Sequence, residues 1–324
     1  MIALLASSPA FVPVLASTAD HSHTRGHGAR SPAAHARAAP CDTIAGAGRA
    51  TVLLVRAALG TIRITGDPTR PLPCATTRGA GARWRVRGDT LELSIPGGTG
   101  VAAPEVDVRV RTALPLRLVL DGATVEATGT DAAVTLRATT GRVRLVQVAT
   151  IRGEVGTARL AASRVAGGVQ LRSTTGPLLL DDVAGDVLVD GGSGDVVLRG
   201  ARGATLDVRT TSGAVRWQGV PDALGRYVIR TTTGPVDLAI APGAPTAGRC
   251  AVRRGECEIG DGLVVLAREV IAGRHVRTWR TAPAPAGPPA ERVVIESVTG
   301  AVRIVRAARL PPPGRLGSAT SHAR

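Results

Sequence analysis

The sequence predicts an all-β protein whose fold is a β-solenoid, or β-helix, of stacked strand–Gly–strand coils of about 18–21 residues. Segments such as TTGRVRL, TTGPLLL, TSGAVRW and TTGPVDL recur along the chain, and apolar residues stand at the same distances from the glycine in each. From Gly176 to Gly234 the successive repeat glycines are 18, 19 and 21 residues apart. This regular spacing is typical of a repeat architecture.

The repeat is defined by apolar positions two and four residues after each glycine and five and seven residues before it. Val143 and Leu145 follow Gly141 in this way, and Val134 and Leu136 precede it. Alternation with a period of two places these side chains on one face of a strand. The structural repeat glycines are Gly60, Gly141, Gly176, Gly194, Gly213, Gly234 and Gly300, with a weaker copy around Gly156.

Each unit is therefore expected to contain two short strands joined by a Thr- or Ser-rich turn, with the glycine at positive φ. One unit cannot bury its inward residues alone, but stacked units bury them against each other. The alternative is a meander of antiparallel hairpins. The chain has no Asn and so no Asn-Gly hairpin turn. The constant register favours stacking, in which Thr hydroxyls form ladders along the turns.

The core must be aliphatic, because 44% of the residues are hydrophobic but the chain has only one Phe, one Tyr, three Trp and one Met. Trp217 and Tyr227 occupy inward repeat positions. We therefore expect both to pack in the core rather than to stack on a ligand.

Composition divides the chain into four parts. These are a signal peptide (1–19), a disordered His/Ala/Arg-rich linker (20–48), the β-solenoid domain (49–306, with a Cys-containing insertion at 243–290) and a disordered tail (307–324). Further strands are expected around Trp84–Val86 and Leu91–Ile95, and a hairpin from Leu263 to Trp279. The Gly300 unit is expected to form the last rung of the stack.

The N-terminus favours export. Residues 2–19 are mostly apolar, and Ser17, Thr18 and Ala19 offer a cleavage site, although no basic residue precedes the apolar run. A weak signal peptide and a start codon placed too late both imply export; the alternative is a disordered cytosolic N-terminus. The body has no apolar run long enough for a transmembrane span. We expect an extracytoplasmic protein, secreted or associated with the cell envelope.

The four cysteines, Cys41, Cys74, Cys250 and Cys257, fit an exported chain. Sequence order suggests Cys41–Cys74 and Cys250–Cys257 disulfides, and two other connectivities are open. Loop entropy gives about 4 and about 2.5 kcal/mol for the two bridges. The chain has no CxxC pair, which disfavours a zinc cage or a thioredoxin-like site.

The net charge of +15 is concentrated at the two ends. Residues 1–104 carry +6, residues 105–242 carry +2 and residues 243–324 carry +7. A nucleic-acid binder places a basic stripe on its folded body, often with aromatic residues. Here the body is nearly neutral, so we predict no nucleic-acid partner. Attraction to an anionic envelope polymer or to lipid headgroups fits better.

A carboxylate cluster is the one feature that resembles a catalytic site. Glycosidases on β-helical folds use paired acids, whereas Asp at turns and outward positions also serves local hydrogen bonding and solubility. We favour the second interpretation and expect no catalytic residues and no cofactor. The cluster consists of Asp181, Asp182, Asp186, Asp190 and Asp195.

Two weaker metal-binding signals occur. The run from Asp190 to Asp195 resembles a calcium-binding nonapeptide, but it is one residue short and occurs once. His21, His23 and His27, with His35 further on, could bind copper, nickel or zinc, or form part of a solvated linker. We favour the linker and predict no functional metal.

The TTxG-x-V-x-L units behind an exported N-terminus resemble the bacterial putative-adhesin family of β-strand-repeat proteins. The resemblance covers residues 50–305 and is best between 134 and 240. It implies a solenoid-like fold of largely unknown function, with no catalytic residues to transfer. The Cys-containing insertion departs from the family pattern.

The sequence thus favours an exported, non-enzymatic, adhesin-like surface scaffold or binding module for a macromolecular partner, such as an envelope polymer or a surface protein. The alternatives are a β-helical carbohydrate-active enzyme, which paired acids in a groove would support, and an envelope-stress accessory protein.

Overall fold

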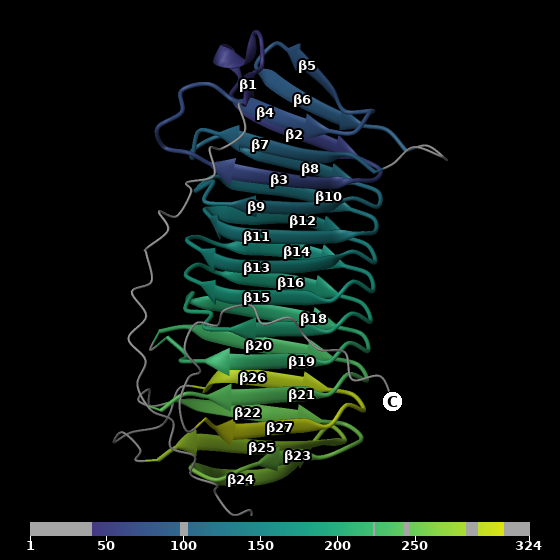
Figure 1. Cartoon of the computed structure of the whole chain (residues 1–324). Helices are drawn as coiled ribbons and strands as arrows, with labels where there is room; N and C mark the ends of the chain where they lie inside the picture. Colours follow the sequence, from purple (N-terminus) through teal and green to yellow (C-terminus); the bar gives the residue numbers. More distant parts are fainter. Residues whose placement is uncertain (1–40, 98–102, 223, 243–245, 283–290, 308–324) are drawn as a thin grey trace, which may run out of the picture. The chain divides into compact units, whose positions relative to one another are not determined.

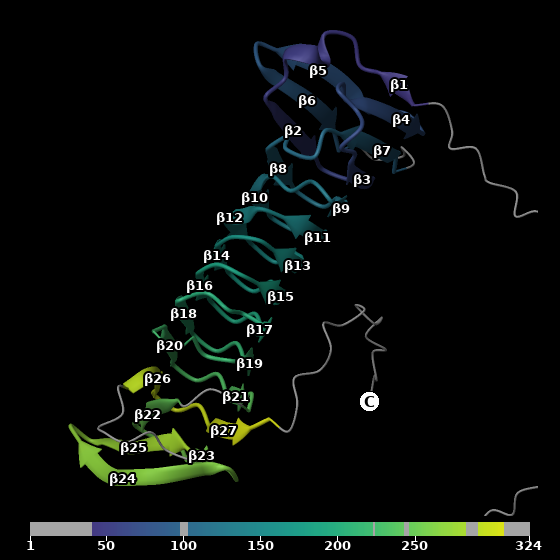
Figure 2. The same cartoon turned by 90° about the vertical axis from the view of Figure 1, so that its left-hand side faces the viewer.

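The described part of the chain folds almost entirely into β-strands, as predicted. The computed structural model describes residues 41–97, 103–222, 224–242, 246–282 and 291–307. Apart from the 3-10 helix η1 (Ala47–Arg49), the regular secondary structure in these ranges is β. None of their helices is long and apolar enough to cross a bilayer. The strands form two sheets, sheet A and sheet B, on either side of an apolar core (Figures 1 and 2).

Sheet A has 13 strands, in the spatial order β1 (Asp42–Thr43), β4 (Cys74–Arg78), β7 (Glu105–Val110), β3 (Thr61–Gly66), β9 (Thr124–Thr128), β11 (Arg142–Val148), β13 (Arg159–Val165), β15 (Leu178–Val183), β17 (Val196–Arg199), β19 (Val215–Gly219), β21 (Val236–Ile240), β27 (Val302–Arg306) and β23 (Cys257–Ile259). Sheet B has 14 strands, in the order β24 (Leu263–Ile271), β25 (Arg274–Thr281), β22 (Ala247–Val252), β26 (Glu291–Ser297), β20 (Arg226–Thr231), β18 (Thr205–Thr210), β16 (Val187–Gly191), β14 (Val169–Ser173), β12 (Thr150–Val155), β10 (Ala133–Ala138), β8 (Leu116–Leu120), β2 (Val52–Ala57), β6 (Thr90–Ile95) and β5 (Arg83–Arg87).

From β8 to β21, consecutive strands alternate between the two sheets. In sheet B, β10 pairs in parallel with β8 and β12, and in sheet A, β11 pairs in parallel with β9 and β13. We call two consecutive strands, one in each sheet, a rung. Parallel pairing between rungs excludes the antiparallel meander for this part of the chain.

The register confirms that equivalent repeat positions lie above one another. Leu160 pairs with Val143 on one side and with Leu178 on the other. Further along the stack, Val215 pairs with Val236 of the next rung. All five side chains point into the core and are at most 1% exposed. The buried side chains of both sheets belong to one continuous apolar cluster. Stacking of aliphatic layers therefore stabilises the fold.

The repeat glycines are required mainly because adjacent rungs approach closely. A Cβ on Gly213 would lie 2.1 Å from the carbonyl oxygen of Gly194, and a Cβ on Gly234 would lie 2.1 Å from the carbonyl oxygen of Gly213. The expected positive φ occurs at Gly60 and Gly141 but at none of the other repeat glycines. The positive-φ explanation was thus wrong for most copies.

Left-handed backbone recurs instead at the other corner of the rungs, at the C-terminal ends of the strands of sheet A. Gln147, Arg164 and Asp182 have φ values of 59°, 54° and 53° in successive rungs, and Gly200 follows with 63°. Only at Gly200 does the residue type fit this conformation without steric cost.

At the N-terminal end, spatial order differs from sequence order. The rung of β2 and β3 lies between the rung of β8 and β9 and the rung of β6 and β7. The first rung in sequence is therefore paired on both sides. β5 and β6 confirm the strands expected around Trp84–Val86 and Leu91–Ile95.

The C-terminal end repeats this arrangement and corrects one prediction. The Gly300 unit, β26 and β27, is not the last rung: it lies between β20 and β21 on one side and β22 and β23 on the other. The segment expected to interrupt the stack forms its final rung. The predicted hairpin is confirmed as β24 and β25.

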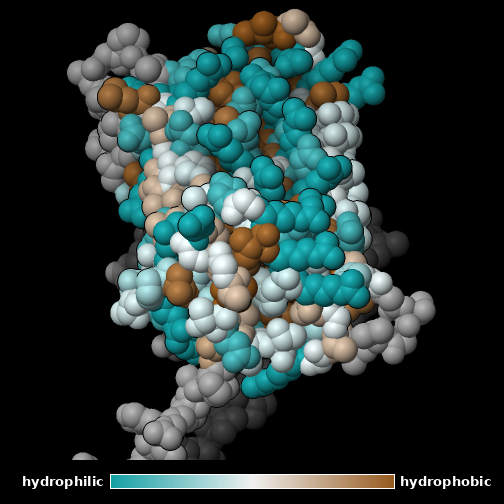
Figure 3. Space-filling model, turned by 90° about the horizontal axis from the view of Figure 1, so that it is seen from above, coloured by the Kyte–Doolittle hydropathy of each residue, from teal (hydrophilic) through white to brown (hydrophobic). Residues whose placement is uncertain are grey.

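Antiparallel strands cover both ends of the stack. β4 and β5 pair antiparallel with β7 and β6 at one end, and β25 pairs antiparallel with β22 at the other. Figure 3 looks down on the end that carries β5 and shows mostly polar side chains with separate apolar patches. We call the antiparallel strands β1, β4 and β5 the N-terminal cap; this end of the stack presents a largely polar surface over the last apolar layer.

Tyr227 and Trp217 lie in the core, as predicted. Each is 2% exposed, and their ring centroids are 5.6 Å apart. The Tyr227 hydroxyl donates to the carbonyl oxygen of Gly203 (2.9 Å) and accepts from the amide of Asp222 (2.8 Å). Burial raises the pKa of this phenol above its usual value.

Tyr227 is the chain's only tyrosine, so its titration can be followed directly. Because its folded pKa is raised, its contribution to stability is complete below the unfolded value of about 10 and is lost as the pH rises through the folded pKa. We expect phenolate absorbance to appear at higher pH in the native chain than in denaturant. Equal midpoints in the two states would contradict this prediction.

Candidate functional site

The in-register rungs align their outward side chains in columns. On sheet B one column reads Arg137, Glu154, Arg172, Asp190 and Arg209, one residue from each of five adjacent strands. The sign of the charge alternates at every step, and Arg172 and Asp190 lie 3.9 Å apart as an ion pair. Since like charges directly opposite are destabilising, alternation suits a parallel in-register stack.

The column breaks this rule once, where Arg209 and Arg230 are neighbours. Asp207 compensates, with ion pairs of 3.1 Å to Arg209 and 3.7 Å to Arg230, and Glu296 pairs with Arg230 at 3.0 Å. The hydrogen bond and charge of Asp207 raise the pKa of Arg209.

A shallow groove of about 530 Å³ runs beside this column, across successive rungs of sheet B. Its lining includes four buried residues at inward positions of four adjacent strands, Ala138, Val155, Ser173 and Gly191. Exposed Thr139 and Thr174 line it at the turns. We call this feature the sheet B groove; it is lined by residues 137–139, 154–156, 172–174, 190–192 and Thr211.

Turn threonines also link neighbouring rungs. The Thr157 hydroxyl donates to the carbonyl oxygen of Thr139 (3.2 Å), and the Thr233 hydroxyl donates to that of Thr211 (3.3 Å). The expected ladder is therefore one of hydroxyl–carbonyl bonds between turns, not of bonds between hydroxyls. The turns above the groove are held in register in this way.

Sheet A carries a second charge column. It reads Asp107, Arg63, Glu126, Arg144, Ala161, Leu179, Val197, Arg216, Asp237, Arg303 and Glu258. Ion pairs join Arg144 to Glu126 (3.4 Å) and Arg303 to Glu258 (3.7 Å). The three apolar members are half-buried. A hollow of about 310 Å³ adjoins Val197 and Arg216. The surface of this hollow is more apolar and less regular than that of the sheet B groove.

The predicted carboxylate cluster is dispersed between the sheets. Asp181 and Asp182 belong to β15 of sheet A, whereas Asp190 belongs to β16 of sheet B. Asp182 pairs with Arg202. Asp186 accepts the Thr205 amide (2.8 Å) and Asp195 accepts the Ala214 amide (3.1 Å). Asp182, Asp186 and Asp195 thus make local interactions at separate places in the stack and do not converge on one site.

The metal predictions fall into two groups. Within the ranges that the structure covers, no group of His, Cys, Asp and Glu side chains is suited to hold a metal ion. In the calcium-like run, Asp190 pairs with Arg172 and Asp195 accepts a backbone amide. His21, His23 and His27 lie outside the described residues, as does His35.

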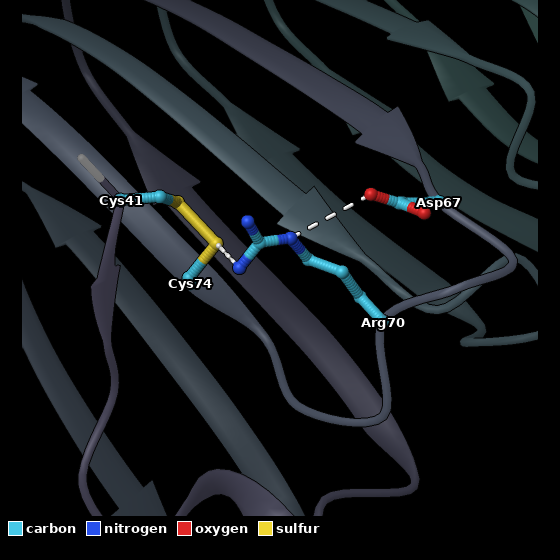
Figure 4. The surroundings of a disulfide bond; sticks show 4 residues. All are labelled: Cys41, Asp67, Arg70 and Cys74. Carbon is cyan, nitrogen blue, oxygen red and sulfur yellow. Dashed lines mark hydrogen bonds and ion pairs between the residues drawn. A yellow bond between two sulfur atoms is a disulfide. The ribbon is translucent and has the colours of Figure 1, made fainter. Parts of the chain in front are cut away.

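The cysteines pair as their sequence order suggested, Cys41 with Cys74 and Cys250 with Cys257. The first bridge joins β4 to the residue preceding β1 in the N-terminal cap. Figure 4 shows Arg70 between this bridge and Asp67: its guanidinium donates to Cys74 Sγ (3.1 Å) and pairs with the carboxylate (3.6 Å). Hydrogen bonds from Thr69 are the main cause of a lowered pKa of Asp67.

Sequence reasoning missed the charge columns and the groove. The signal was present, because outward residues at one offset from each glycine can be read down the repeats like the inward ones. At three residues after the glycine, Arg216, Asp237 and Arg303 already alternate in sign in the sequence.

Comparison with known proteins adds little. No family model matches the chain, and no curated protein matches it. One solved structure that does match is a putative cell adhesion protein from Clostridium sporogenes, with a TM-score of 0.25 and 11% identity over 83% of this chain and 98% of that chain. A likeness at this TM-score carries no argument, so the case for function rests on the surface described above.

Proposed function

We propose that the chain is an exported, non-enzymatic β-solenoid that binds an extended envelope polymer along the sheet B groove. The observation that carries this proposal is that adjacent strands, about 4.8 Å apart, each present a charged residue, a buried small or aliphatic residue and a Thr or Gly at the turn, with the sign of the charge alternating. Such a surface suits a ligand whose own units repeat along its length, and a sugar unit is comparable in length with this spacing.

The chemistry of the groove favours a hydroxyl-rich polymer with little net charge. Its charged wall alternates Arg137, Glu154, Arg172 and Asp190, so no single sign dominates. The exposed turn hydroxyls of Thr139 and Thr174 allow a flat chain to exchange hydrogen bonds with the groove. A linear glycan meets these requirements better than a polyanion does.

A binding role is favoured over catalysis because the described lining of the groove does not offer two free carboxyl groups. Of its two acids, Asp190 is ion-paired with Arg172, and only Glu154, which lies between Arg137 and Arg172 in the column, makes no ion pair with another described residue. A glycosidase needs one carboxyl group free to donate a proton and a second one across the scissile bond. The two disulfides and the apolar N-terminus support export.

Binding can be tested by filling the groove. Thr174→Arg places a long side chain in it from an exposed position, and Thr65→Arg, at an exposed position of β3 in sheet A, is the matched control. We expect Thr174→Arg to weaken retention on linear β-glucan, chitin or peptidoglycan by about tenfold, and the control to leave it unchanged.

Two results would contradict the proposal. Equal retention of both variants, or no retention of the wild type on any of these polymers, would exclude the groove as a glycan site. Release of new reducing ends by the wild-type chain would instead favour the carbohydrate-active enzyme.

A further inference from the structure

β24 is the last strand of sheet B and has one open edge. It pairs with β25 on one side, and on its other side no described strand pairs with it (Figure 2). It is nine residues long. An edge of this length offers a row of backbone N–H and C=O groups to another strand.

The other three sheet edges are protected. In sheet A, the edge strands β1 and β23 have two and three residues. In sheet B, the opposite edge is β5, where Arg83, Arg85 and Arg87 alternate along the strand. Very short strands and charged side chains are the usual means of preventing strand addition. β24 has neither the short length nor a comparable run of charges.

The side chains of β24 are unusually apolar for an exposed edge. Val264, Leu266, Val270 and Ile271 are 42%, 41%, 67% and 50% exposed, which accounts for half of the large exposed hydrophobic residues among those the structure describes. Only Arg268 and Glu269 interrupt the apolar run. A strand added at this edge would therefore bury its own apolar side chains against those of β24.

The surroundings of the edge are basic. No ion pair within the described ranges involves Arg253, Arg254, Arg268, Arg274 or Arg277, all of which lie in or near the hairpin. The outward columns of the stack, in contrast, contain paired arginines. A hollow of about 410 Å³ beside the hairpin is lined in part by Arg268 and Arg277. Glu256 and Glu269 line the same hollow and Asp261 precedes β24, so three acids offset part of this charge, and the five arginines leave this end of sheet B with a net positive charge.

We propose that β24 is an acceptor strand that binds an extended peptide with alternating apolar and acidic residues from a partner protein. Backbone pairing would supply affinity, the exposed aliphatic side chains would contact the apolar residues, and the unpaired arginines would select acidic ones. This site lies outside the sheet B groove, so the two proposals are independent.

A second copy of the chain fits the edge less well. In an antiparallel pair related by a two-fold axis, directly opposite residues lie on the same face. A register centred on the charged residues therefore sets Arg268 against Arg268 or Glu269 against Glu269, and like charges directly opposite are destabilising. Two copies would also bring two basic ends together.

The test uses the full chain and a labelled Val-Glu alternating peptide. Three control peptides are needed: a Val-Lys peptide, a scrambled peptide of the same composition, and a Val-Glu peptide N-methylated along one edge, which cannot pair. We expect binding by the Val-Glu peptide alone, detected by fluorescence anisotropy, with slower hydrogen exchange at the β24 amides.

Variants then locate the site. Val270→Lys should weaken binding by about tenfold, because it adds charge and removes an apolar contact at the edge. Leu188→Lys is the matched control, on the outer face of β16 and 40% exposed. Unchanged thermal unfolding verifies that both variants fold.

Three outcomes would overturn the proposal. They are equal affinity for the N-methylated peptide, equal binding by the Val270 and Leu188 variants, and concentration-dependent dimerisation that Val270→Lys abolishes. The last would identify a second copy as the occupant.

Discussion

Replacing Gly213 by alanine is expected to destabilise the protein by about 3 kcal/mol, the upper end of the usual cost of overpacking. The new Cβ would lie 2.1 Å from the carbonyl oxygen of Gly194. That atom belongs to the backbone of a neighbouring rung and cannot move without stretching the strand pairing of β17 and β19. Chemical denaturation, monitored by far-ultraviolet circular dichroism, measures the effect.

Gly88→Ala is the matched control for this substitution. Gly88 has a φ of +59°, and nothing lies within 4 Å of the position its Cβ would take. Its replacement should cost only about 1 kcal/mol, the penalty of a left-handed alanine. If the two variants are equally stable, close approach between rungs is not the reason for the repeat glycines.

Removing residues 291–324 is expected to have a still larger effect, because it deletes an interior rung. Val293, Ile295, Val302 and Ile304 are at most 1% exposed. At about 1.5–3 kcal/mol for each buried side chain, their loss removes on the order of 6–12 kcal/mol, comparable with the whole stability of a typical domain. We expect β20 to β25 to lose protection from hydrogen exchange.

A chain ending at Ala307 is the control, since it retains both β26 and β27. It should unfold at the same denaturant concentration as the full chain. A 291–324 deletion that keeps the native protection of β22 and β25 would contradict the interior position of this rung.

The repeat was predictable because its signal is local. Alternation around each glycine fixes which side chains face inward, and the register of Val143, Leu160 and Leu178 follows from it. The order of rungs at the two ends was not predictable in the same way. The inward positions of β26 match those of any neighbouring rung, so periodicity alone cannot tell which rungs it lies between.

The surface was less predictable than the core. Alternation predicted that Asp190 and Arg172 face outward, but their ion pair depends on which rungs are neighbours. The carboxylate cluster was close in sequence yet divided between two sheets, because consecutive strands alternate between them. Sequence proximity is therefore a poor guide to a shared site in this fold.

The position of the end rungs has a mechanical consequence. A force applied through the two ends of the described body would first load Cys41, which its disulfide ties to β4, and β27, which is hydrogen-bonded to β21 on one side and β23 on the other. Neither end of the described body offers a free strand that can be peeled away one bond at a time. Tension must instead separate β4 or β27, each of which is paired with a strand on both sides, so the stack should resist extension better than one that unwinds from its terminal rung.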